Sequence, residues 1–561
     1  MFFQVGVNAQ HRIRSVGLQS HRPFFFFRYT DPTVFILAMF TIALALAQTA
    51  HDHPAPPAST AVLEIAKRPL PLRNGIGAAH DPVATSSKEA QAFYDQGLAY
   101  LHSYVWLEAA RSFNQAVRLD PNLAVAHAQL AVAYTELNAP AAARDALARA
   151  KALAAKAGDH DGAHLDARAL QMAAESDASK LSAYRSALDA ALAKYPQDDE
   201  LWLARGQAES SDPAERGQGS AAGSIRFYET ALALAPAHFA AHHYLTHAYE
   251  NTGRIDEALR EGATYARMAP EVPHARHMHG HNLRRVGKVD EAIDEFRTAD
   301  ALESAYFKAD AIPAEHDWHY QHNLDLLATT YQYVGQMKKA EPLLKASFVM
   351  PSPLVVQELN KRAWTVFLRA RGRAGEALAA ARVMAGHRSP VVGAAGHVEA
   401  GRALLLQGEF QAATEEANTA LRLMRSAPPG AGLVATPLKA LQGEFFLRTG
   451  QREKGRAMLE DVTRAVRAAR GPDAWVQATF DIEAIARAAR ESGDWNLAGW
   501  AARQMIEHDA RYAGAHYALA SVARHAGDEK TAHAELALAA QYWAKADPDL
   551  PELHTIRGTR P

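Results

Sequence analysis

The sequence predicts an all-α protein, a right-handed α-solenoid of about twelve helix-turn-helix repeats. Glycines recur at the ends of amphipathic segments: Gly253 and Gly287 are 34 residues apart, and so are Gly493 and Gly527. An alanine follows each of these glycines five residues later. Glycine tolerates the positive φ of a tight turn, and alanine suits a point where two helix backbones approach closely. A recurring period of this length is typical of helical-repeat architectures.

The first repeat carries the most complete pattern. Counting Ala90 as position 1, the packing and turn positions hold Phe93, Gly97, Tyr100, Ala109, Phe113, Ala116 and Pro121. The second repeat follows from Ala124 without a gap, and later repeats begin near residues 165, 199, 239, 273, 321, 358, 394, 436, 479 and 513. Over about residues 90 to 545 this pattern resembles the tetratricopeptide repeat, in an exported protein of bacterial type with a histidine-rich central groove.

The resemblance implies how the repeats are used. In this family the first helix of each pair lines a concave groove, and its positions 2, 5, 9, 12 and 13 point into that groove. The ligands of such grooves are usually peptides, so we expect a protein or peptide partner. Fold alone does not give function, however.

Composition excludes several classes of site. The 561 residues are 48% hydrophobic and 22% charged, which is typical of a folded soluble chain. There is no cysteine, so disulfides, thiolate metal sites and cysteine nucleophiles are excluded. The formal net charge of -2 shows no basic surplus, and we therefore expect no nucleic-acid partner.

The N-terminus predicts export. Arginines precede the apolar run Val34–Ala47, which ends in the small-residue sequence Ala45-Leu46-Ala47. This order is typical of a Sec-type signal peptide, so we expect a periplasmic or secreted protein without stable membrane insertion after cleavage. The alternative is an N-terminal membrane anchor. The expected divisions are a signal peptide at 1–47, a flexible linker at 48–85, N-terminal repeats at 86–300, an insert loop at 301–320, C-terminal repeats at 321–545 and a tail at 546–561.

Histidines gather at the groove positions of two adjacent repeats. His243 and His247 hold positions 5 and 9 of the repeat that begins at Phe239, and His277 and His281 hold them in the next. Each pair places two imidazoles on one helix face. Because neighbouring helices lie about 8–10 Å apart, the four side chains are expected to face one small volume. The sequence therefore predicts a metal site formed by His243, His247, His277, His281, His319 and His322.

The ligand chemistry narrows the choice of ion. Without cysteine the donors are imidazole, carboxylate and water, which suit a divalent transition metal such as zinc, copper or iron. Two ions can be accommodated, because the candidate ligands outnumber the needs of one. If fewer than four protein ligands reach an ion, a position stays open for catalysis.

Other polar residues near these positions are candidates for binding a ligand in the groove. His274 lies at a helix start, and its direction is left open. Arg284 and Arg285 either hold an anion near the metal or are solvated surface charge. Asp317 is a possible metal ligand or a partner that contacts a ligand. These candidates are His274, Glu250, Asn251, Arg284, Arg285, Asp317 and Asp325.

The remaining alternatives concern other histidines and the activity. His127, His397, His516 and His242 hold position 4 of their repeats, which is a packing position, so we interpret them as structural. Three functions stay open: a scaffold that binds a peptide, a metal-dependent oxidase or hydrolase, and a metal-binding protein without catalysis. Catalytic residues are not identified.

Overall fold

The computed structural model describes residues 60–210, 222–352, 354–427, 431–469 and 472–557. Within these ranges the chain is largely helical and contains no strand. The signal peptide expected at 1–47 and the start of the expected linker lie outside the described residues. Among the helices that are described, none is both long and apolar enough to cross a membrane.

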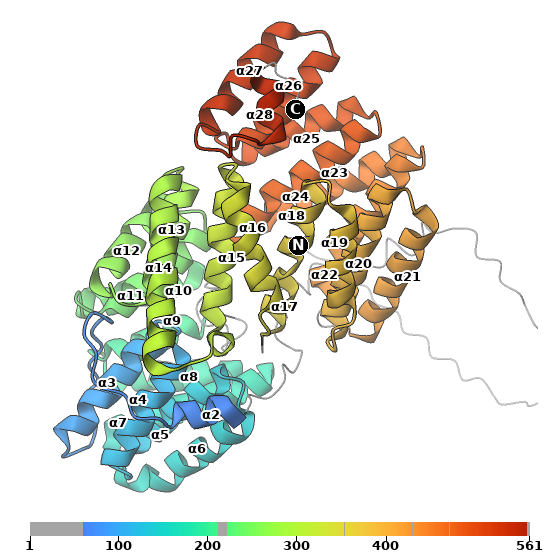
Figure 1. The fold of residues 1–561 in the computed structure, drawn as a ribbon. Coiled ribbons are helices and arrows are strands. Elements are labelled where there is room, and N and C mark those ends of the chain that lie inside the picture. The colour runs from blue at the N-terminus through green and yellow to red at the C-terminus, as the bar shows by residue number, and fades with distance from the viewer. Residues whose placement is uncertain (1–59, 211–221, 353, 428–430, 470–471, 558–561) are drawn as a thin grey trace, which may run out of the picture. The chain divides into compact units, whose positions relative to one another are not determined.

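Twelve consecutive helix pairs account for most of the described chain, which confirms the predicted all-α solenoid (Figure 1). The first six pairs are α3 (Lys88–His102) with α4 (Trp106–Leu119), α5 (Ala124–Glu136) with α6 (Pro140–Leu153), α7 (Gly158–Ser176) with α8 (Leu181–Lys194), α9 (Asp199–Gln207) with α10 (Ala222–Leu234), α11 (Phe239–Asn251) with α12 (Ile255–Met268), and α13 (Pro273–Arg285) with α14 (Val289–Asp310).

The last six pairs continue the same alternation, with the first helix of one pair broken in two. They are α15 (Trp318–Tyr333) with α16 (Met337–Val349), α17 (Val355–Asn360) and α18 (Arg362–Ala370) with α19 (Ala374–Ala385), α20 (Pro390–Gln407) with α21 (Phe410–Ser426), α22 (Ala431–Arg448) with α23 (Arg452–Ala468), α24 (Pro472–Glu491) with α25 (Trp495–His508), and α26 (Ala513–His525) with α27 (Glu529–Tyr542). Short 3-10 turns η1 (Ala154–Lys156), η2 (Ala178–Lys180) and η3 (Ala314–His316) join some of the helices.

The recurring glycines end the first helix of a pair. Gly253 and Gly287 both have φ of 81°, a left-handed conformation that glycine adopts without steric cost. The residue after each glycine donates its backbone N–H to a carbonyl in the last helical turn, as Arg254 does to Tyr249 at 2.8 Å. This closure satisfies a carbonyl that the helix end would otherwise leave unpaired.

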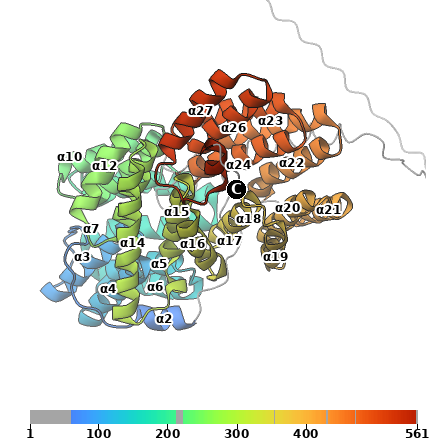
Figure 2. The same ribbon diagram turned by 45° about the horizontal axis from the view of Figure 1, so that its top comes forward.

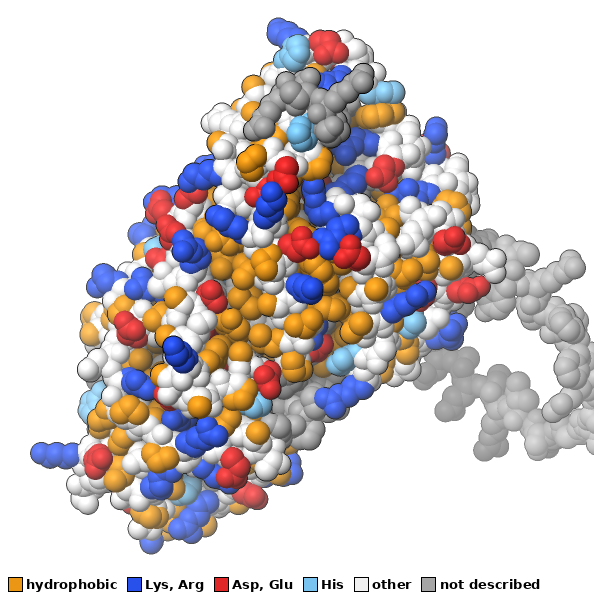
Figure 3. All heavy atoms as spheres, viewed as in Figure 1, with side chains coloured by type: hydrophobic (Ala, Val, Ile, Leu, Met, Phe, Trp, Pro, Cys, Tyr) orange, Lys and Arg blue, Asp and Glu red, His pale blue; other side chains and the backbone are white. Residues whose placement is uncertain are grey.

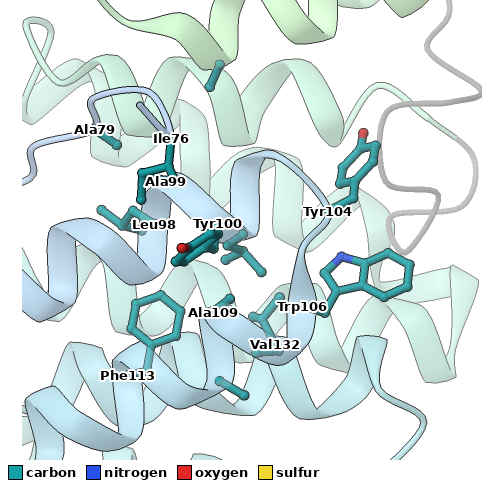
Figure 4. Packing of buried hydrophobic residues seen from close by; sticks show 14 of the residues in the cluster. Ile76, Ala79, Leu98, Ala99, Tyr100, Tyr104, Trp106, Ala109, Phe113 and Val132 are labelled. Carbon is teal, nitrogen blue, oxygen red and sulfur yellow. The ribbon is translucent and has the colours of Figure 1, made fainter. Parts of the chain in front are cut away.

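Apolar side chains fill the space between paired helices, as the first repeat shows (Figure 4). Leu98, Tyr100 and Phe113 are buried between α3 and α4. A Cβ on residue 97 would lie 2.4 Å from the Phe113 ring, so the glycine there allows the two helices to approach closely. The same contact between a first and a second helix recurs along the chain and gives each repeat its share of a continuous core.

The prediction of an insert loop at 301–320 is wrong over its first half. Helix α14 runs 22 residues to Asp310, because residues 301–310 contain no glycine or proline and continue an amphipathic pattern. Ala311, with φ of 52°, ends the helix. The extension reaches α4, where Arg111 donates to Asp310 at 2.5 Å. Both ribbon views show α14 running towards α3 and α4 (Figures 1 and 2).

Two segments expected to be irregular also pack against the repeats. In the linker expected at 48–85, α2 (Thr60–Ala66) contacts α4, and Ile65 and Ile76 are buried. In the tail expected at 546–561, α28 (Pro551–Arg557) follows the buried Leu550. Both segments carry apolar residues that pack against a neighbouring repeat. The polar composition of the two segments alone did not indicate this packing.

Acidic and basic side chains are interspersed over the face drawn in Figure 3, around apolar side chains in its middle.

Candidate metal centre

The predicted histidines lie on the first helices of three adjacent repeats, α11, α13 and α15. All of these imidazoles are buried, although histidine is more often part-exposed in folded proteins. The exposed fractions are 0% for His243 and His277, 2% for His247 and His274, 3% for His281, 4% for His319 and 7% for His322. Seven imidazoles buried together need a common explanation, because a buried polar group costs free energy unless it has a partner.

The first triad is formed by His243, His247 and His274. The Nε2 atom of His243 lies 3.1 Å from Nε2 of His247 and 3.0 Å from Nε2 of His274. One ligand atom from each residue lies within 4.8 Å of the others. Three ring nitrogens on one small volume are the donor arrangement that a transition metal requires.

The second triad is formed by His277, His281 and His322. The Nε2 atoms of His277 and His281 are 2.9 Å apart. His322 comes from the next repeat, with its ring centroid 4.7 Å from that of His277. One ligand atom from each of the three again lies within 4.8 Å of the others. The repeat thus builds two similar sites, each on an HxxxH pair completed by a third histidine.

His319 lies between the two triads. Its ring centroid is 5.0 Å from that of His274 and 4.7 Å from that of His277. Its Nε2 is buried and has no hydrogen-bond partner among the described residues. This imidazole is therefore available to either triad or to both.

The backbone and a neighbouring side chain fix the orientation of two of these rings. The Nδ1 atom of His243 lies 2.6 Å from the carbonyl oxygen of His102, so this nitrogen carries the proton and donates. The Nδ1 atom of His277 lies 2.9 Å from Oδ1 of Asn323, whose amide nitrogen donates to the Phe296 carbonyl. Each ring therefore presents an Nε2 lone pair to its triad, which is how metal-binding histidines are usually held.

A carboxylate orients the histidine between the triads. Nδ1 of His319 lies 2.5 Å from Oε1 of Glu303 on α14. Burial, with Asp317 and Asp300 nearby, raises the pKa of Glu303 well above its usual range. A positive charge beyond His319 would favour the ionised form of Glu303 by Coulomb attraction.

Burial keeps His247 and five neighbouring imidazoles neutral. It lowers the pKa of His247 to about 3. Burial and the neighbouring histidines hold the pKa values of His243, His274, His277, His281 and His319 well below their usual range. Neutral imidazole is the form that binds metal, so at neutral pH no proton has to be displaced from these rings.

Aromatic side chains from a distant part of the chain cover the first triad. Tyr104 lies in the turn between α3 and α4, and Trp106 is the first residue of α4 (Figure 4). The Tyr104 ring centroid is 4.7 Å from that of His243 and 5.2 Å from that of His274. Trp318 stacks on Trp106 at 5.0 Å and donates its Nε1–H to the Tyr104 carbonyl at 3.0 Å. This cover contributes to the burial of the first triad.

Some of the expected ligand positions differ from the structure. The four histidines of α11 and α13 do not surround one point but belong to two triads. His274, whose direction was left open, completes the first. Asp317 is the N-cap of α15, where its Oδ1 accepts from the His319 backbone N–H at 2.9 Å, and it belongs to neither triad. Helix capping occupies one of its two carboxylate oxygens.

The other groove candidates lie outside the two triads. Arg284 is buried, donates to Thr330 at 3.0 Å, and has its pKa lowered to about 10 by burial. Arg285 lies over Trp475, 3.6 Å from Glu250. Burial raises the pKa of Asp325 to about 7. Asn251 ends α11.

Three of the four histidines interpreted as structural pair with the second helix of their own repeat. His242 contacts Glu261, His397 contacts Glu416 and His516 contacts Glu535, each at a separation of 19 residues. His127 lies 3.3 Å from the Pro121 carbonyl. These contacts explain the histidines without a ligand.

Sequence reasoning missed the residues of other elements that contact the histidine rings. Glu303 and Tyr104 come from elements other than the first helices, so repeat positions do not identify them. Glu303 was also placed in an expected loop. The helical pattern of residues 301–310 is the signal that would have placed Glu303 on a helix.

Comparisons with known proteins give little beyond helical repeats. No family model matches the chain, and no curated protein matches it. Among solved structures, a human IFIT1 dimer with PPP-AAAA is similar at 11% identity, over 90% of this chain and 100% of that one, with a TM-score of 0.35. The human IFIT1 dimer with m7Gppp-AAAA gives 12% identity, the same coverage and the same TM-score. TM-scores of this size do not establish a shared arrangement of the repeats.

Proposed function

We propose that the protein is a metal-binding solenoid of tetratricopeptide type, whose two histidine triads bind a pair of transition-metal ions. One observation carries the proposal. Ring nitrogens of three buried histidines converge in each triad within 4.8 Å of one another, with Nε2–Nε2 distances of 3.0–3.1 Å in the first and of 2.9 Å between His277 and His281 in the second. A neutral imidazole has one N–H and one lone pair, so His243, whose proton goes to the His102 carbonyl, has one lone pair facing two partners.

The donor set favours late transition metals. Each triad consists of imidazoles, a composition that suits copper(II) and zinc ahead of iron. His319 is the residue that can serve both ions, since it lies between the triads.

Catalysis is a second candidate. Three protein ligands for each ion leave a position for water or substrate, which is typical of catalytic rather than structural sites. An oxidase or a hydrolase fits this arrangement. A peptide partner directly on the histidines fits less well, because all seven imidazoles are at most 7% exposed. A peptide or protein partner would bind elsewhere along the groove, and export of the chain remains a prediction from its N-terminus.

Elemental analysis of purified protein tests the proposal. After growth with copper or zinc, His247→Ala and His281→Ala should each lose one ion relative to wild type, and the double variant should lose two. His242→Ala is the matched control, because this residue neighbours His243 on α11 but contacts Glu261. Loss of all metal in one single variant would indicate one shared ion, and unchanged content in the double variant would refute the site.

A further inference from the structure

A second group of metal-binding side chains lies away from the histidine centre, in the first four repeats. Asp81 belongs to the segment that precedes α3. His160 and His164 are one turn apart on α7, with the same HxxxH spacing as the groove histidines. Asp198 is the N-cap of α9. Three parts of the chain that are far apart in sequence thus meet here.

Three of the four side chains converge on one volume, and the fourth, Asp198, contacts two of them. Oδ2 of Asp198 lies 3.0 Å from Nε2 of His160 and 2.7 Å from Nε2 of His164. One ligand atom from each of Asp81, His160 and His164 lies within 4.8 Å of the other two. Asp81 is 4% exposed and His164 is 6% exposed, whereas the His160 side chain is 34% exposed. The group is therefore buried on three sides and reachable from solvent past His160.

Neighbouring groups hold the carboxylates in place. Oδ1 of Asp198 accepts from the Leu201 backbone N–H at 2.9 Å, which leaves Oδ2 for the imidazoles. The Tyr94 hydroxyl donates to Asp81 at 3.2 Å. Asp161, next to His160, accepts from the Ala84 backbone N–H at 2.9 Å and so ties the Asp81 segment to α7. Outer partners of this kind orient ligands in metal sites.

The charge of the group calls for a cation. Asp81, Asp198 and Asp161 lie beside the two histidines, with Asp161 3.5 Å from Nδ1 of His160, and burying a carboxylate is costly unless it is paired or coordinates a metal. Even with one histidine protonated the acids are in excess, and a divalent ion would neutralise two carboxylates at once.

We propose that Asp81, His160, His164 and Asp198 form a second metal site, which binds a divalent cation through two imidazoles and two carboxylates. This donor set is harder than the all-imidazole triads, so it suits manganese(II), iron(II) and zinc. The bound ion clamps the segment at Asp81 onto α7 and α9. The site is independent of the histidine centre and of any activity there.

Manganese(II) is the probe that separates the two sites, because it binds most weakly in the order of divalent metals and prefers oxygen donors. Full-length metal-free protein is titrated with manganese(II) while electron paramagnetic resonance measures the free ion. Wild type and His247→Ala/His281→Ala should both bind one equivalent. His160→Ala and Asp81→Asn should each weaken binding by more than about 100-fold, because loss of a ligand exceeds the ~10–100-fold effect of an outer partner.

Two controls make the result decisive. His80→Ala removes an exposed histidine that contacts Asp95 nearby, and it should leave manganese binding unchanged. Circular dichroism checks that each variant is folded, and Asp81→Asn keeps the size of the side chain if His160→Ala unfolds. Wild type that binds no manganese(II) at millimolar concentration would overturn the proposal. So would either ligand variant if it stays folded and binds manganese as wild type does.

Discussion

Two parts of the solenoid bury polar side chains at the same repeat positions. His247 and His281 hold position 9 of the repeats that begin with α11 and α13. Arg402 and Glu444 hold position 9 of the repeats that begin with α20 and α22. All four side chains are at most 4% exposed.

The C-terminal part satisfies its own charges. Arg402 contacts Glu444 at 2.6 Å, and Arg369 contacts Glu399 at 2.7 Å. Thr365 donates to the same Glu399 oxygen at 2.9 Å. Opposite charges therefore alternate from α18 to α22, and each buried ion has a partner of the other sign.

The histidine part has no such internal closure. Among the described residues, His247 Nδ1, His274 Nδ1 and His319 Nε2 are buried without hydrogen-bond partners. Hydrogen bonds between the rings, at Nε2–Nε2 distances of 2.9–3.1 Å, use some of their N–H groups and lone pairs but leave these three nitrogens without a partner. Buried nitrogens without a partner occur in both parts, since Nε of Arg369 and Nε of Arg402 also have none among the described residues. The difference is therefore one of charge: the C-terminal row is neutralised by its own ions of opposite sign, whereas the histidine row offers imidazole donors that an ion from outside would complete.

The largest expected difference between the two parts appears on metal removal. A ligand that binds only the folded state stabilises it by about 4 kcal/mol when present at a thousand times its Kd. Chelation of metal-loaded protein should therefore lower the unfolding midpoint, measured by circular dichroism. Hydrogen exchange should increase in α11, α13 and α15 and stay unchanged in α18, α20 and α22. Equal exchange with and without chelator in the histidine helices would contradict the comparison.

The converse change is Glu399→Gln, which breaks the C-terminal set. Removing one partner of a buried ion pair costs about 3–5 kcal/mol, so urea denaturation should show a loss of this size at neutral pH. Burial alone would raise the pKa of Glu399, but Arg369 and Arg402 outweigh it and hold the pKa below its ordinary value of 4.5.

The sign of the pH dependence follows from that lowered pKa. Stability from ionised Glu399 is complete above pH 4.5, the value in the unfolded chain, and is lost as the pH falls through the folded-state value. The difference between wild type and Glu399→Gln should therefore shrink below about pH 4.5. Metal content should be unaffected. A difference that persists unchanged in acid would assign the loss to packing and not to charge.

The repeat pattern was enough to predict the fold. Gly253 and Gly287 mark turns because the left-handed backbone conformation is a local property, readable from one residue and its spacing. The same register placed His243, His247, His277 and His281 on adjacent helix faces. What local pattern could not give is which of these rings share an ion, since that depends on the offset between neighbouring helices.

The partners of the histidines were harder to predict for a similar reason. Glu303 reaches His319 because α14 is longer than a standard second helix, and Tyr104 reaches His243 from a repeat far earlier in the chain. Contacts between sequence-distant segments leave no periodic signal. His274 was uncertain because a helix start can direct a side chain either way, and contact with His243 decides it.

Glu303→Gln tests whether a partner behind a ring matters to the histidine centre. Loss of such an outer partner usually weakens metal affinity about 10–100-fold, and we expect this range from competition with a coloured chelator. Glu295→Gln is the matched control on the same helix, because Glu295 contacts His279 on the other side of α13 at 3.0 Å. Equal metal affinities of the two variants would show that Glu303 does not support metal binding at the histidine centre.

The smallest effect is expected at position 4, where a histidine contacts an acid of its own repeat. His397 and Glu416 are each 22% exposed, so solvent screens the pair, and such pairs contribute about 0–1 kcal/mol. His397→Ala should therefore change the urea midpoint little and leave metal content unchanged, although the residue lies on a first helix like the groove histidines. The two kinds of position differ in the direction of the side chain. Position 4 faces the second helix of its own repeat, whereas positions 5 and 9 face the first helices of neighbouring repeats. A loss of metal in His397→Ala would mean that histidine content, and not this geometry, determines binding.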